Sequence, residues 1–327
     1  MSSGAGVAIT PGNSSGTYHR YHALESFQRA NRILNHARMW FTTGTRMSAE
    51  LKTLKINTHY HSHHAMRIAF HLASLWWLVE SGFHWSGLAI LTANYVVGAL
   101  SITVGFHRYF SHKSFKTNRF FQFATAFIGC CQLQGGPIAW AAIHRHHHRE
   151  SDQPQDLHSP AQGFYQAHYG WLLNPSTYEV AFGKGLPDLN KFKELVWLDR
   201  YNFIPPIIYF IALWWGGEWY AARNPGTLID GTYVLFWGGI LRIVLLWHVT
   251  WSVNSICHIW GTRVFATKDD SRNNLWVALL SLGEGWHNNH HKYPSSARNG
   301  IGWRQPDVSY YFILLMKRIG IVKDIRR

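Results

Sequence analysis

Four apolar runs alternate with polar, histidine-rich stretches along the chain. The runs cover residues 68–79, 88–106, 203–220 and 233–253. Only a short polar segment around Gly82 separates the first two, which favours a helical hairpin. Because about 20 apolar residues cross a bilayer as a helix, the pattern predicts an all-α membrane protein with about four transmembrane helices.

The third and fourth runs contain residues that are unusual inside a membrane. Pro205 and Pro206 stand near the start of the third run, where a helix tolerates proline. Arg242 and His248 interrupt the fourth run. A charge within a span is usually functional or reaches towards the interface, so we retain the fourth span in the prediction.

Another apolar segment, residues 118–143, connects two of the histidine-rich stretches. A full span here would leave those two stretches on opposite sides of the membrane. Because their histidines have to meet on one side if they act together, we expect a re-entrant or interfacial helix instead.

Lysine and arginine residues are distributed unevenly between the apolar runs. Eight lie in residues 1–67, 10 in 107–200 and 11 in 258–327, whereas only Arg223 falls in the two intervening loops. The positive-inside rule then predicts that the N-terminus, the central region and the C-terminus are cytoplasmic. All the histidine clusters would thus lie in one cytoplasmic helical cap.

The first 64 residues differ in character from the rest. They begin Gly/Ser-rich, continue polar and basic, and end in a histidine-rich run at 59–64. We expect residues 1–64 to form a flexible N-terminal arm and residues 65–327 to form the membrane domain. Residues 1–24 lack the apolar core of a cleavable signal; they are Ser-rich and acid-poor, which leaves open an organelle transit segment or a bacterial plasma membrane protein.

The composition also favours a membrane protein. Aromatic residues make up 16% of the chain and charged residues only 15%, whereas about 25% is typical of soluble domains. The formal net charge of +14 suits nucleic acid or an anionic membrane surface. Because the basic residues follow the predicted membrane sidedness and form no stripe, we expect no nucleic-acid partner. Cys130, Cys131 and Cys257 form no CxxC pair and predict no zinc site.

Three compact histidine clusters stand just beyond or between the apolar runs. One is an HxxxxH pattern at residues 107–112, and two are HxxHH patterns at 144–148 and 287–291. The i, i+3, i+4 spacing of the HxxHH patterns places three imidazoles on one face of a helix. His107 and His112 are five residues apart, which suits a helix end where the chain can turn.

Together the clusters supply more ligands than one ion can use. A metal ion of coordination number four to six leaves some of the eight imidazoles over, so the sequence predicts two metal ions. Zinc, copper, nickel and iron all accept imidazole, and geometry selects among them. The candidate ligands are His107, His112, His144, His147, His148, His287, His290 and His291.

Over roughly residues 66–320 the chain resembles the membrane fatty acid desaturases, particularly the Δ9 type. Besides the three histidine boxes, the shared motifs are Gln134–Pro137, Ser151-Asp152, His158-Ser159, Gly163-Phe164, Gly170-Trp171 and the continuous stretch 283–291. The resemblance implies a non-haem di-iron enzyme that uses O2 and two external electrons to introduce a cis double bond into a saturated acyl chain. Iron also suits oxidation of an unactivated C–H bond, which side chains alone cannot perform.

The same resemblance implies further site residues. His258 would be a ninth metal ligand and Asn254 would hold a metal-bound water, whereas His146, His248 and the histidines of 59–64 stay outside the site. Metal-bound histidines usually donate their other ring N–H to a carboxylate or a carbonyl. The candidate carboxylates are Asp152, Asp156, Asp270 and Glu284.

A bent apolar tunnel is expected to hold the acyl chain. By the resemblance, the residues at its kink are Gln134, Trp140, Thr250 and Trp251. Tyr95 and Ala99 would close its methyl end, and the small Ala99 would admit a long chain. Trp140 and Trp251 also suit the simpler role of interfacial aromatic anchors.

The acyl carrier and the electron donor are less strongly indicated. Ala142-Ile143 stand where acyl-CoA members of the family carry an Arg-Asp pair, which favours a glycerolipid substrate over a CoA ester. No cytochrome b5 motif is evident, so a separate ferredoxin or cytochrome b5 is expected to supply electrons. Candidate contacts, which membrane sidedness explains equally well, are Lys113, Lys116, Arg149 and Arg304.

Two other functions remain open at this stage. A membrane hydroxylase or alkane monooxygenase would use the same metal chemistry but return oxygen to the substrate. A membrane metal carrier or sensor would bind metal at the same histidines without redox chemistry. The compartment also stays open: a bacterial plasma membrane, or endoplasmic reticulum or plastid membrane in a eukaryote.

Overall fold

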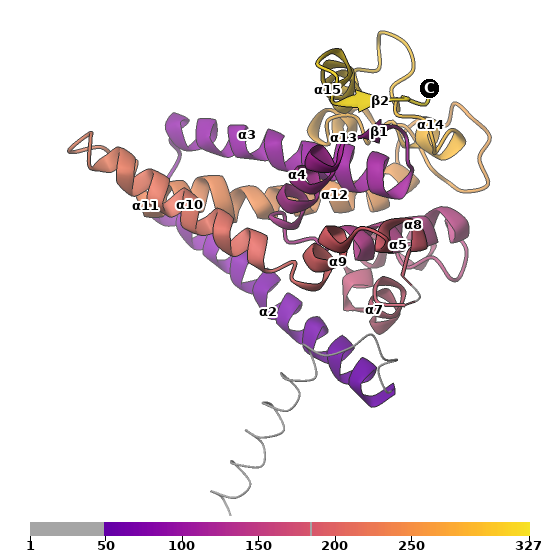
Figure 1. Cartoon of the computed structure of the whole chain (residues 1–327), viewed down its shortest axis with the longest axis horizontal. Helices are drawn as coiled ribbons and strands as arrows, with labels where there is room; N and C mark the ends of the chain where they lie inside the picture. Colours follow the sequence, from indigo (N-terminus) through magenta and orange to yellow (C-terminus); the bar gives the residue numbers. More distant parts are fainter. Residues whose placement is uncertain (1–48, 184) are drawn as a thin grey trace, which may run out of the picture. The chain divides into compact units, whose positions relative to one another are not determined.

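The structure is a computed structural model that describes residues 49–183 and 185–327 (Figure 1). Helices make up most of this part of the chain. The long helical stretches are α2 (Ala49–Ser81), α3 (Trp85–Leu100) continued by the π-helix η1 (Ser101–Ser111), α10 (Ile204–Ala221), and α11 (Gly231–Val234) continued by the π-helix η4 (Leu235–Leu241) and α12 (Arg242–Ile259).

Shorter elements fill the connections between them. They are α4 (Arg119–Cys130), α5 (Pro137–Glu150), α6 (Phe164–His168), α7 (Pro175–Ala181), α8 (Pro187–Asn190), α9 (Lys193–Arg200), α13 (Leu275–Leu280), α14 (His287–Lys292), α15 (Val308–Arg318), and the 3-10 turns η2 (Pro160–Gln162) and η3 (Gly170–Leu173). Strands β1 (Lys116–Thr117) and β2 (Val322–Lys323) pair antiparallel, with Lys116 opposite Lys323.

Each of the four apolar runs lies within one of the long helical stretches. Two of these stretches, Trp85–Ser111 and Gly231–Ile259, are long and apolar enough to cross a membrane, with 27 and 29 residues. The runs 68–79 and 203–220 fall in α2 and α10. The described part of the chain is therefore mainly helical with two candidate spans, and the four-span arrangement stays a prediction.

The apolar segment 118–143 forms two helices rather than the single helix expected. Asn118 begins α4, where its side chain accepts a hydrogen bond from the Phe121 N–H, as an N-cap should. The helix ends at Cys130, and α5 starts afresh at Pro137. Gly135, with φ of 91°, supplies the turn between them, and proline at the first helical position fixes the new start.

Glycines allow the two candidate spans to pack closely. A Cβ at Gly87 of α3 would fall within the ring of Trp237 on η4, and one at Gly238 would lie 3.0 Å from Asn94. Small residues at such contacts let helix backbones approach in a membrane. The two spans therefore run side by side, as Figure 1 shows for α3 and α12.

The charge in the fourth run is satisfied within the protein. Arg242 is 1% exposed; its guanidinium donates to the Gln132 side chain and to the Gly238 carbonyl, and it lies 5.2 Å from the Tyr209 ring centroid. An intramembrane charge is tolerated when it is paired inside a bundle. Arg242 thus does not argue against a span at Gly231–Ile259.

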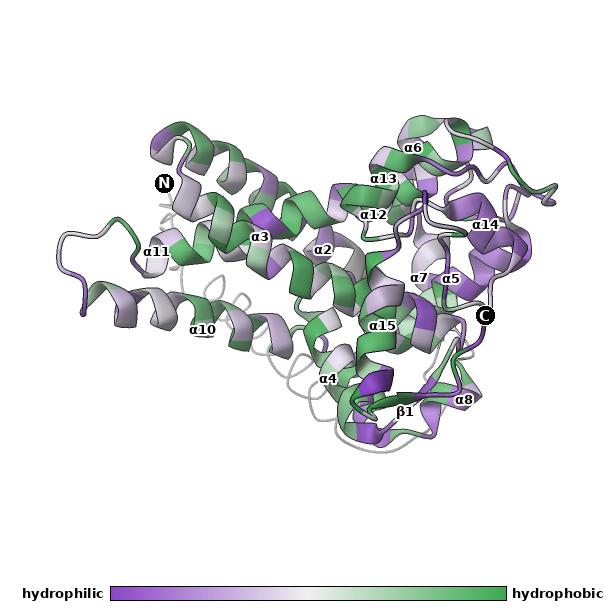
Figure 2. Ribbon diagram, turned by 90° about the horizontal axis from the view of Figure 1, so that it is seen from above, coloured by the Kyte–Doolittle hydropathy of each residue, from purple (hydrophilic) through white to green (hydrophobic). Residues whose placement is uncertain are grey.

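Polar and apolar residues are separated along the molecule. Figure 2 shows apolar residues along α3, α10 and α12, and polar residues gathered where α5 and α14 lie. Exposed apolar side chains on α10 include Ile207, Ile211, Trp215 and Trp219. The expected arm, residues 1–64, falls largely outside the described residues, and from Ala49 onward it belongs to α2.

Candidate metal centre

Nine histidines converge in two adjoining groups of buried and partly buried side chains. Within each group the ligand nitrogens all lie within 4.8 Å of one another. The first group has five members, His107, His112, His144, His148 and His290, and the second has four, His147, His258, His287 and His291. The structure thus brings together all eight box histidines and His258.

The two HxxHH boxes divide their members between the groups. On α5, His144 and His148 join the first group while His147 joins the second. On α14 the division is reversed, because His290 joins the first group and His287 and His291 the second. Adjacent residues on a helix point about 100° apart, so one turn can serve two neighbouring sites.

The HxxxxH box depends on a π-helix. His107 lies within η1, and the His112 N–H donates to the His107 carbonyl over 3.2 Å, the i to i+5 bond of a π-helix. This brings the ring centroids to 4.9 Å. An α-helix would separate the two rings by about 140° around its axis, and π-helical turns are frequent at functional sites.

Four carboxylates contact the outward-facing Nδ1 atoms of four of these histidines. The distances are 3.1 Å for His147 to Asp156, 2.9 Å for His258 to Asp152, 2.7 Å for His291 to Asp269 and 2.6 Å for His107 to Glu284. A carboxylate at Nδ1 fixes the tautomer and leaves Nε2 as the free ligand atom. This arrangement is typical of metal-bound histidine.

The carboxylates are themselves held by other groups. Glu284 accepts from Arg108 at 3.0 Å and from the Asn299 side chain at 2.9 Å, and Arg108 also pairs with Asp307. Asp152 has φ of 58°, a backbone conformation that non-glycine residues rarely adopt. Its carboxylate accepts from His258 and from the Asp270 N–H, so the strained residue has a positioning role.

The protonation states suit metal binding. Burial first, and then neighbouring histidines, hold the pKa values of His112, His144 and His148 well below the usual value. The pKa of His291 is lowered to about 4 by burial, although Asp269 opposes the change. Neutral imidazole is the form that ligates metals, so these rings are ready to bind near neutral pH.

Several ring nitrogens have no partner within the described residues. The Nε2 atoms of His147 and His291 are buried without a hydrogen bond, while their Nδ1 atoms contact carboxylates. Nε2 atoms also face each other, at 3.0 Å between His107 and His290 and at 3.1 Å between His258 and His287. Cations placed between such lone pairs would satisfy them, so the residues fit a pair of metal ions.

Two apolar cavities meet beside the first histidine group. The first is lined from α2, α5, α7 and α12, and the lining of the second includes Ala99, Ile102 and Thr103. The residues common to both cavities are Trp140, His144, Thr250 and Asn254. Both cavities therefore border His144, a member of the first histidine group.

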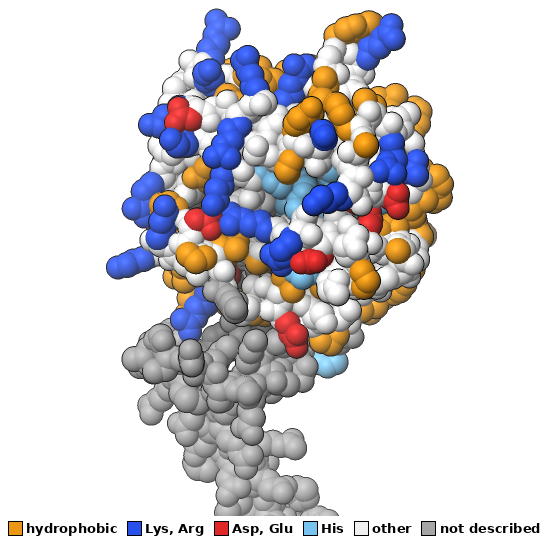
Figure 3. Space-filling model, turned by 90° about the vertical axis from the view of Figure 1, so that its right-hand side faces the viewer, with side chains coloured by type: hydrophobic (Ala, Val, Ile, Leu, Met, Phe, Trp, Pro, Cys, Tyr) orange, Lys and Arg blue, Asp and Glu red, His pale blue; other side chains and the backbone are white. Residues whose placement is uncertain are grey.

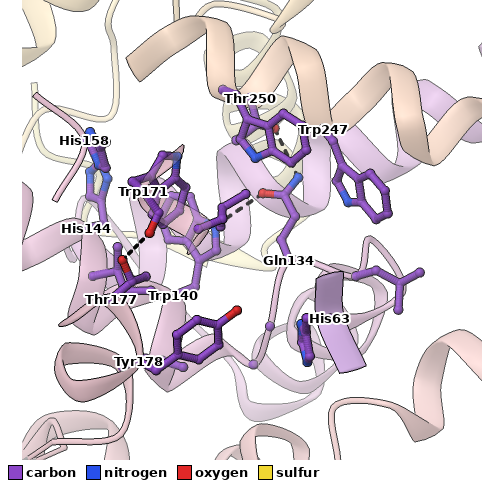
Figure 4. A pocket seen from close by; sticks show the side chains of 18 of the residues that line it. His63, Gln134, Trp140, His144, His158, Trp171, Thr177, Tyr178, Trp247 and Thr250 are labelled. Atoms are coloured by element: carbon purple, nitrogen blue, oxygen red, sulfur yellow. Dashed lines mark hydrogen bonds between the residues drawn. The ribbon is translucent and has the colours of Figure 1, made fainter. Parts of the chain in front are cut away.

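A hydrogen-bonded network includes two of the shared lining residues, Trp140 and Thr250 (Figure 4). Gln134 donates to the Thr250 hydroxyl over 3.1 Å and accepts from the Trp140 indole over 3.4 Å. The Thr250 hydroxyl in turn donates to the Leu246 carbonyl. The predicted kink residues Gln134, Trp140 and Thr250 thus contact one another, and Trp251 lines the first cavity.

The remaining predicted residues differ in position. Asn254 lines both cavities. Ala99 lines the second cavity, whereas Tyr95 does not appear in the described lining and donates to the Leu280 carbonyl. Asp270 is exposed and pairs with Arg263 at 3.2 Å. Asp270 therefore lies apart from the imidazoles.

Sequence reasoning missed Asp269, the neighbour of Asp270. Although burial opposes its ionisation, the hydrogen bonds from His291 and Ser271 hold the pKa of Asp269 below its usual value. The sequence prediction named Asp270 and not Asp269, because no spacing rule separates the two neighbouring residues.

Two histidines that the sequence excluded stay outside the metal groups. His146 contacts the Gln155 carbonyl and Arg149. His248 belongs to a separate chain of imidazoles, 3.0 Å from both His71 and His168. Both ring nitrogens of His248 are occupied in this way, so it has no ligand atom to offer the metal groups.

Comparison with known proteins supports the same chemistry. Residues 83–305 match the fatty acid desaturase family. The chain is 39% identical over 249 residues to the sn-2 palmitoyl-lipid 9-desaturase of Nostoc sp. (strain 36), covering 74% of this chain and 82% of that protein. It is 37% identical over 265 residues to the palmitoyl-monogalactosyldiacylglycerol delta-7 desaturase of Arabidopsis thaliana, and this match covers 80% of this chain and 67% of that protein.

The name of a third relative specifies a different acyl carrier. The chain is 36% identical over 249 residues to the acyl-CoA C20 Delta5-desaturase of Anemone leveillei, covering 75% of this chain and 76% of that protein. The three relatives share desaturation and differ in carrier and position. With matches over most of its length and the three histidine boxes folded into one centre, the chain belongs to the fatty acid desaturase family and is an oxidoreductase.

Proposed function

We propose that the protein introduces a cis double bond, at the Δ9 position, into a saturated acyl chain of a membrane glycerolipid. The observation that carries this proposal is the junction of the two cavities at His144, a member of the first histidine group. An acyl chain that follows the bent path would pass its reacting carbons beside the metal centre. Two hydrogens leave the chain, and O2 is reduced to two waters with two added electrons and two protons.

Two iron ions are the proposed cofactor. The first histidine group would hold one iron and the second group the other, with Asn254 holding a metal-bound water. When bound, the irons would supply the oxidation of the acyl chain by O2. Imidazole suits iron as well as zinc and copper, and the family's redox chemistry favours iron here.

The chain's own residues orient the substrate and exclude water. The Gln134–Thr250–Trp140 network fixes the bend, and an acyl chain held there can present only a few carbons to His144. Positioning of this kind determines regioselectivity, because a reacting atom has to lie within a few ångströms of the oxidising group. The carboxylates Asp152, Asp156, Asp269 and Glu284 would keep the ligand rings oriented.

The Δ9 position and the lipid carrier rest on two further observations. The Nostoc relative is named as a palmitoyl-lipid 9-desaturase. Ala142-Ile143 replace the charged pair of the acyl-CoA branch and lie on α5. An apolar pair offers no hydrogen bond to a CoA headgroup, so a glycerolipid is the preferred donor.

The proposed topology has four spans with the metal centre on the cytoplasmic side. Since His144 and His287 belong to adjoining groups, the chain between them has to cross the membrane an even number of times. Gly231–Ile259 supplies one crossing, and α10 is the long apolar helix that would supply the other. In the same topology, α2 and α3 form a helical hairpin that crosses the membrane twice, and residues 65–327 form one membrane domain.

A ferredoxin or cytochrome b5 is proposed as the electron donor. Figure 3 shows the end of the molecule near α5 and α14, where lysine and arginine side chains surround a hollow in which histidines are visible. Lys113, Lys116 and Arg149 pair with acidic neighbours, whereas Arg304 lies 4.8 Å from the Trp303 ring. An acidic donor would gain from this face, and its reaction should slow as ionic strength rises.

Expression in a host that lacks unsaturated fatty acids tests the proposal. The expected result is a Δ9 cis double bond in glycerolipid acyl chains, located by mass spectrometry in each lipid class. A hydroxylated product would instead establish the monooxygenase alternative. Purified protein that binds metal but consumes no O2 with a reductant and saturated lipid would establish a non-redox metal-binding role.

A further inference from the structure

The first cavity contains a buried cation without a partner. Arg67 of α2 is 5% exposed, lines this cavity, and its Nη1 atom has no hydrogen bond within the described residues. The other two buried arginines in the described part of the chain are paired: Arg108 with Glu284 and Asp307, and Arg242 with Gln132. Leaving a buried charge unpaired is costly, so Arg67 points to an absent anionic ligand.

The surroundings of Arg67 offer no counter-charge. The described residues that line the first cavity include no aspartate or glutamate, and Arg67 is the single lysine or arginine among them. The polar lining groups Thr177 and Asn202 donate to the Trp171 and Asp199 carbonyls. Burial lowers the pKa of His64 most, and the positive charge of Arg67 lowers it further. A low pKa keeps His64 neutral, so no second cation forms beside Arg67. Among the described residues, a single lysine or arginine side chain therefore faces this cavity.

The helix that carries Arg67 is anchored against the site. Met66 and Phe70, on either side of Arg67 in α2, pack against a cluster that includes Trp171, Trp247 and Trp251. The Phe70 and Trp247 ring centroids are 5.7 Å apart. The helix turn that carries Arg67 is thus held against the cavity wall, so its side chain reaches the cavity from a fixed point of the backbone.

The position of this wall fits the polar end of an acyl substrate. His63, one helical turn before Arg67, lies on one side of the cavity in Figure 4, with His144 and His158 on the other side. His144 also lines the second cavity, whose lining includes Ala99. A chain with its methyl end at Ala99 and its reacting carbons at His144 would bring its headgroup to the α2 wall.

We propose that Arg67 is a headgroup-specificity residue that binds a phosphate oxygen of a glycerophospholipid donor. The inference rests on the proposed function, because it assumes that the two cavities hold an acyl chain. A guanidinium forms strong charge-assisted hydrogen bonds with phosphate. A neutral glycolipid offers no negative charge at this place.

The test compares two donors on the same holoenzyme preparation. Dipalmitoyl-phosphatidylglycerol carries the phosphate, and dipalmitoyl-monogalactosyldiacylglycerol is its uncharged counterpart, both in mixed micelles. In Arg67→Met, which keeps an apolar stem, kcat/KM for phosphatidylglycerol relative to the galactolipid should fall by about tenfold or more, mainly through KM. Arg67→Lys should recover part of this ratio, and the exposed Arg318→Met should leave it unchanged.

The ratio between donors does not depend on how much of a variant is folded, because both rates come from one preparation. Phosphatidylglycerol should also raise the thermal midpoint of the wild type more than that of Arg67→Met. An equal loss with both donors, or no loss with phosphatidylglycerol, overturns the inference. Arg67 dependence with palmitoyl-CoA alone also overturns it, since the phosphate would then belong to CoA. A wild type that desaturates no donor refutes the proposed function instead.

Discussion

Individual carboxylates orient individual imidazole rings by contacting Nδ1, and Asp269 is the clearest case. Its carboxylate lies 2.7 Å from Nδ1 of His291, whose Nε2 is buried and has no partner within the described residues. Asp269→Asn removes the charge that favours the Nδ1–H tautomer. Carboxylates in this position typically contribute 10- to 100-fold to metal affinity or activity. We expect a loss of about that size, measured as iron retained per protein against a competing chelator.

Asp270→Asn is the matched control for this change. Asp270 is adjacent in sequence, but its side chain is 65% exposed and pairs with Arg263. Surface ion pairs contribute little, so iron retention should match the wild type. Equal losses in the two variants would mean that Asp269 has no special relation to the metal.

Ala99 is expected to limit the length of the acyl chain. It is 1% exposed and lines the second cavity, as Ile102 and Thr103 do. A phenyl ring in its place would occupy part of that cavity, so Ala99→Phe should shift the products towards shorter acyl chains. Fatty acid analysis of a host supplied with chains of several lengths measures the shift.

Val97→Phe provides the comparison on the same helix. Val97 is 54% exposed, on a surface of α3 that is open in the protein. Added bulk there does not touch the cavity, so the product profile should stay that of the wild type. If the Ala99→Phe profile is also unchanged, the second cavity does not hold the methyl end.

At the scale of the helices, the sequence identified the histidines that converge better than it identified the elements that carry them. The HxxHH spacing correctly predicted helical faces for 144–148 and 287–291, because that periodicity is local. It did not predict that each box would serve two groups, since the division depends on where the facing helix lies. The π-helix of η1 was also beyond reach, because His107 and His112 fit any helix end.

The break between α4 and α5 has a similar explanation. Gly135 and Pro137 are local signals for a turn and a helix start, but the apolar run of 118–143 outweighed them in the prediction. A hydrophobic run indicates which residues are buried, but it does not indicate whether they form one helix or two. In this segment the residues of the turn, Gly135 and Pro137, determine where the helices end and begin.

Packing of α4 against η1 depends on Gly129. A Cβ at Gly129 would fall within the ring of Phe106, which is fully buried in the adjoining core. Overpacking of this kind typically costs about 1–3 kcal/mol, so Gly129→Ala should lower the thermal midpoint in detergent. Gly216→Ala on α10 is the control, because no heavy atom outside its own helix lies within 4 Å of the added Cβ. Equal midpoints for the two variants would contradict the packing argument.

At the scale of the whole molecule, the metal centre constrains the topology more strongly than hydropathy does. Hydropathy alone supports two spans, Trp85–Ser111 and Gly231–Ile259. With only those two, the central region would lie across the membrane from residues 287–291. Yet His148 and His290 approach to 2.9 Å. If both candidate spans cross the membrane, the chain between these two histidines needs a further crossing, and α10, with exposed Ile211 and Trp215, is the helix suited to make it.

Cysteine labelling in sealed cells distinguishes the two topologies. The native cysteines, Cys130, Cys131 and Cys257, are all buried, so their background reaction with a membrane-impermeant maleimide should be low. Asn224, in the exposed loop after α10, should become reactive from outside as Asn224→Cys, whereas Lys191→Cys, at an exposed position before α10, should react only after the membrane is opened. Since four spans put the loop and the metal centre on opposite sides, equal accessibility of the two positions would exclude α10 as a crossing.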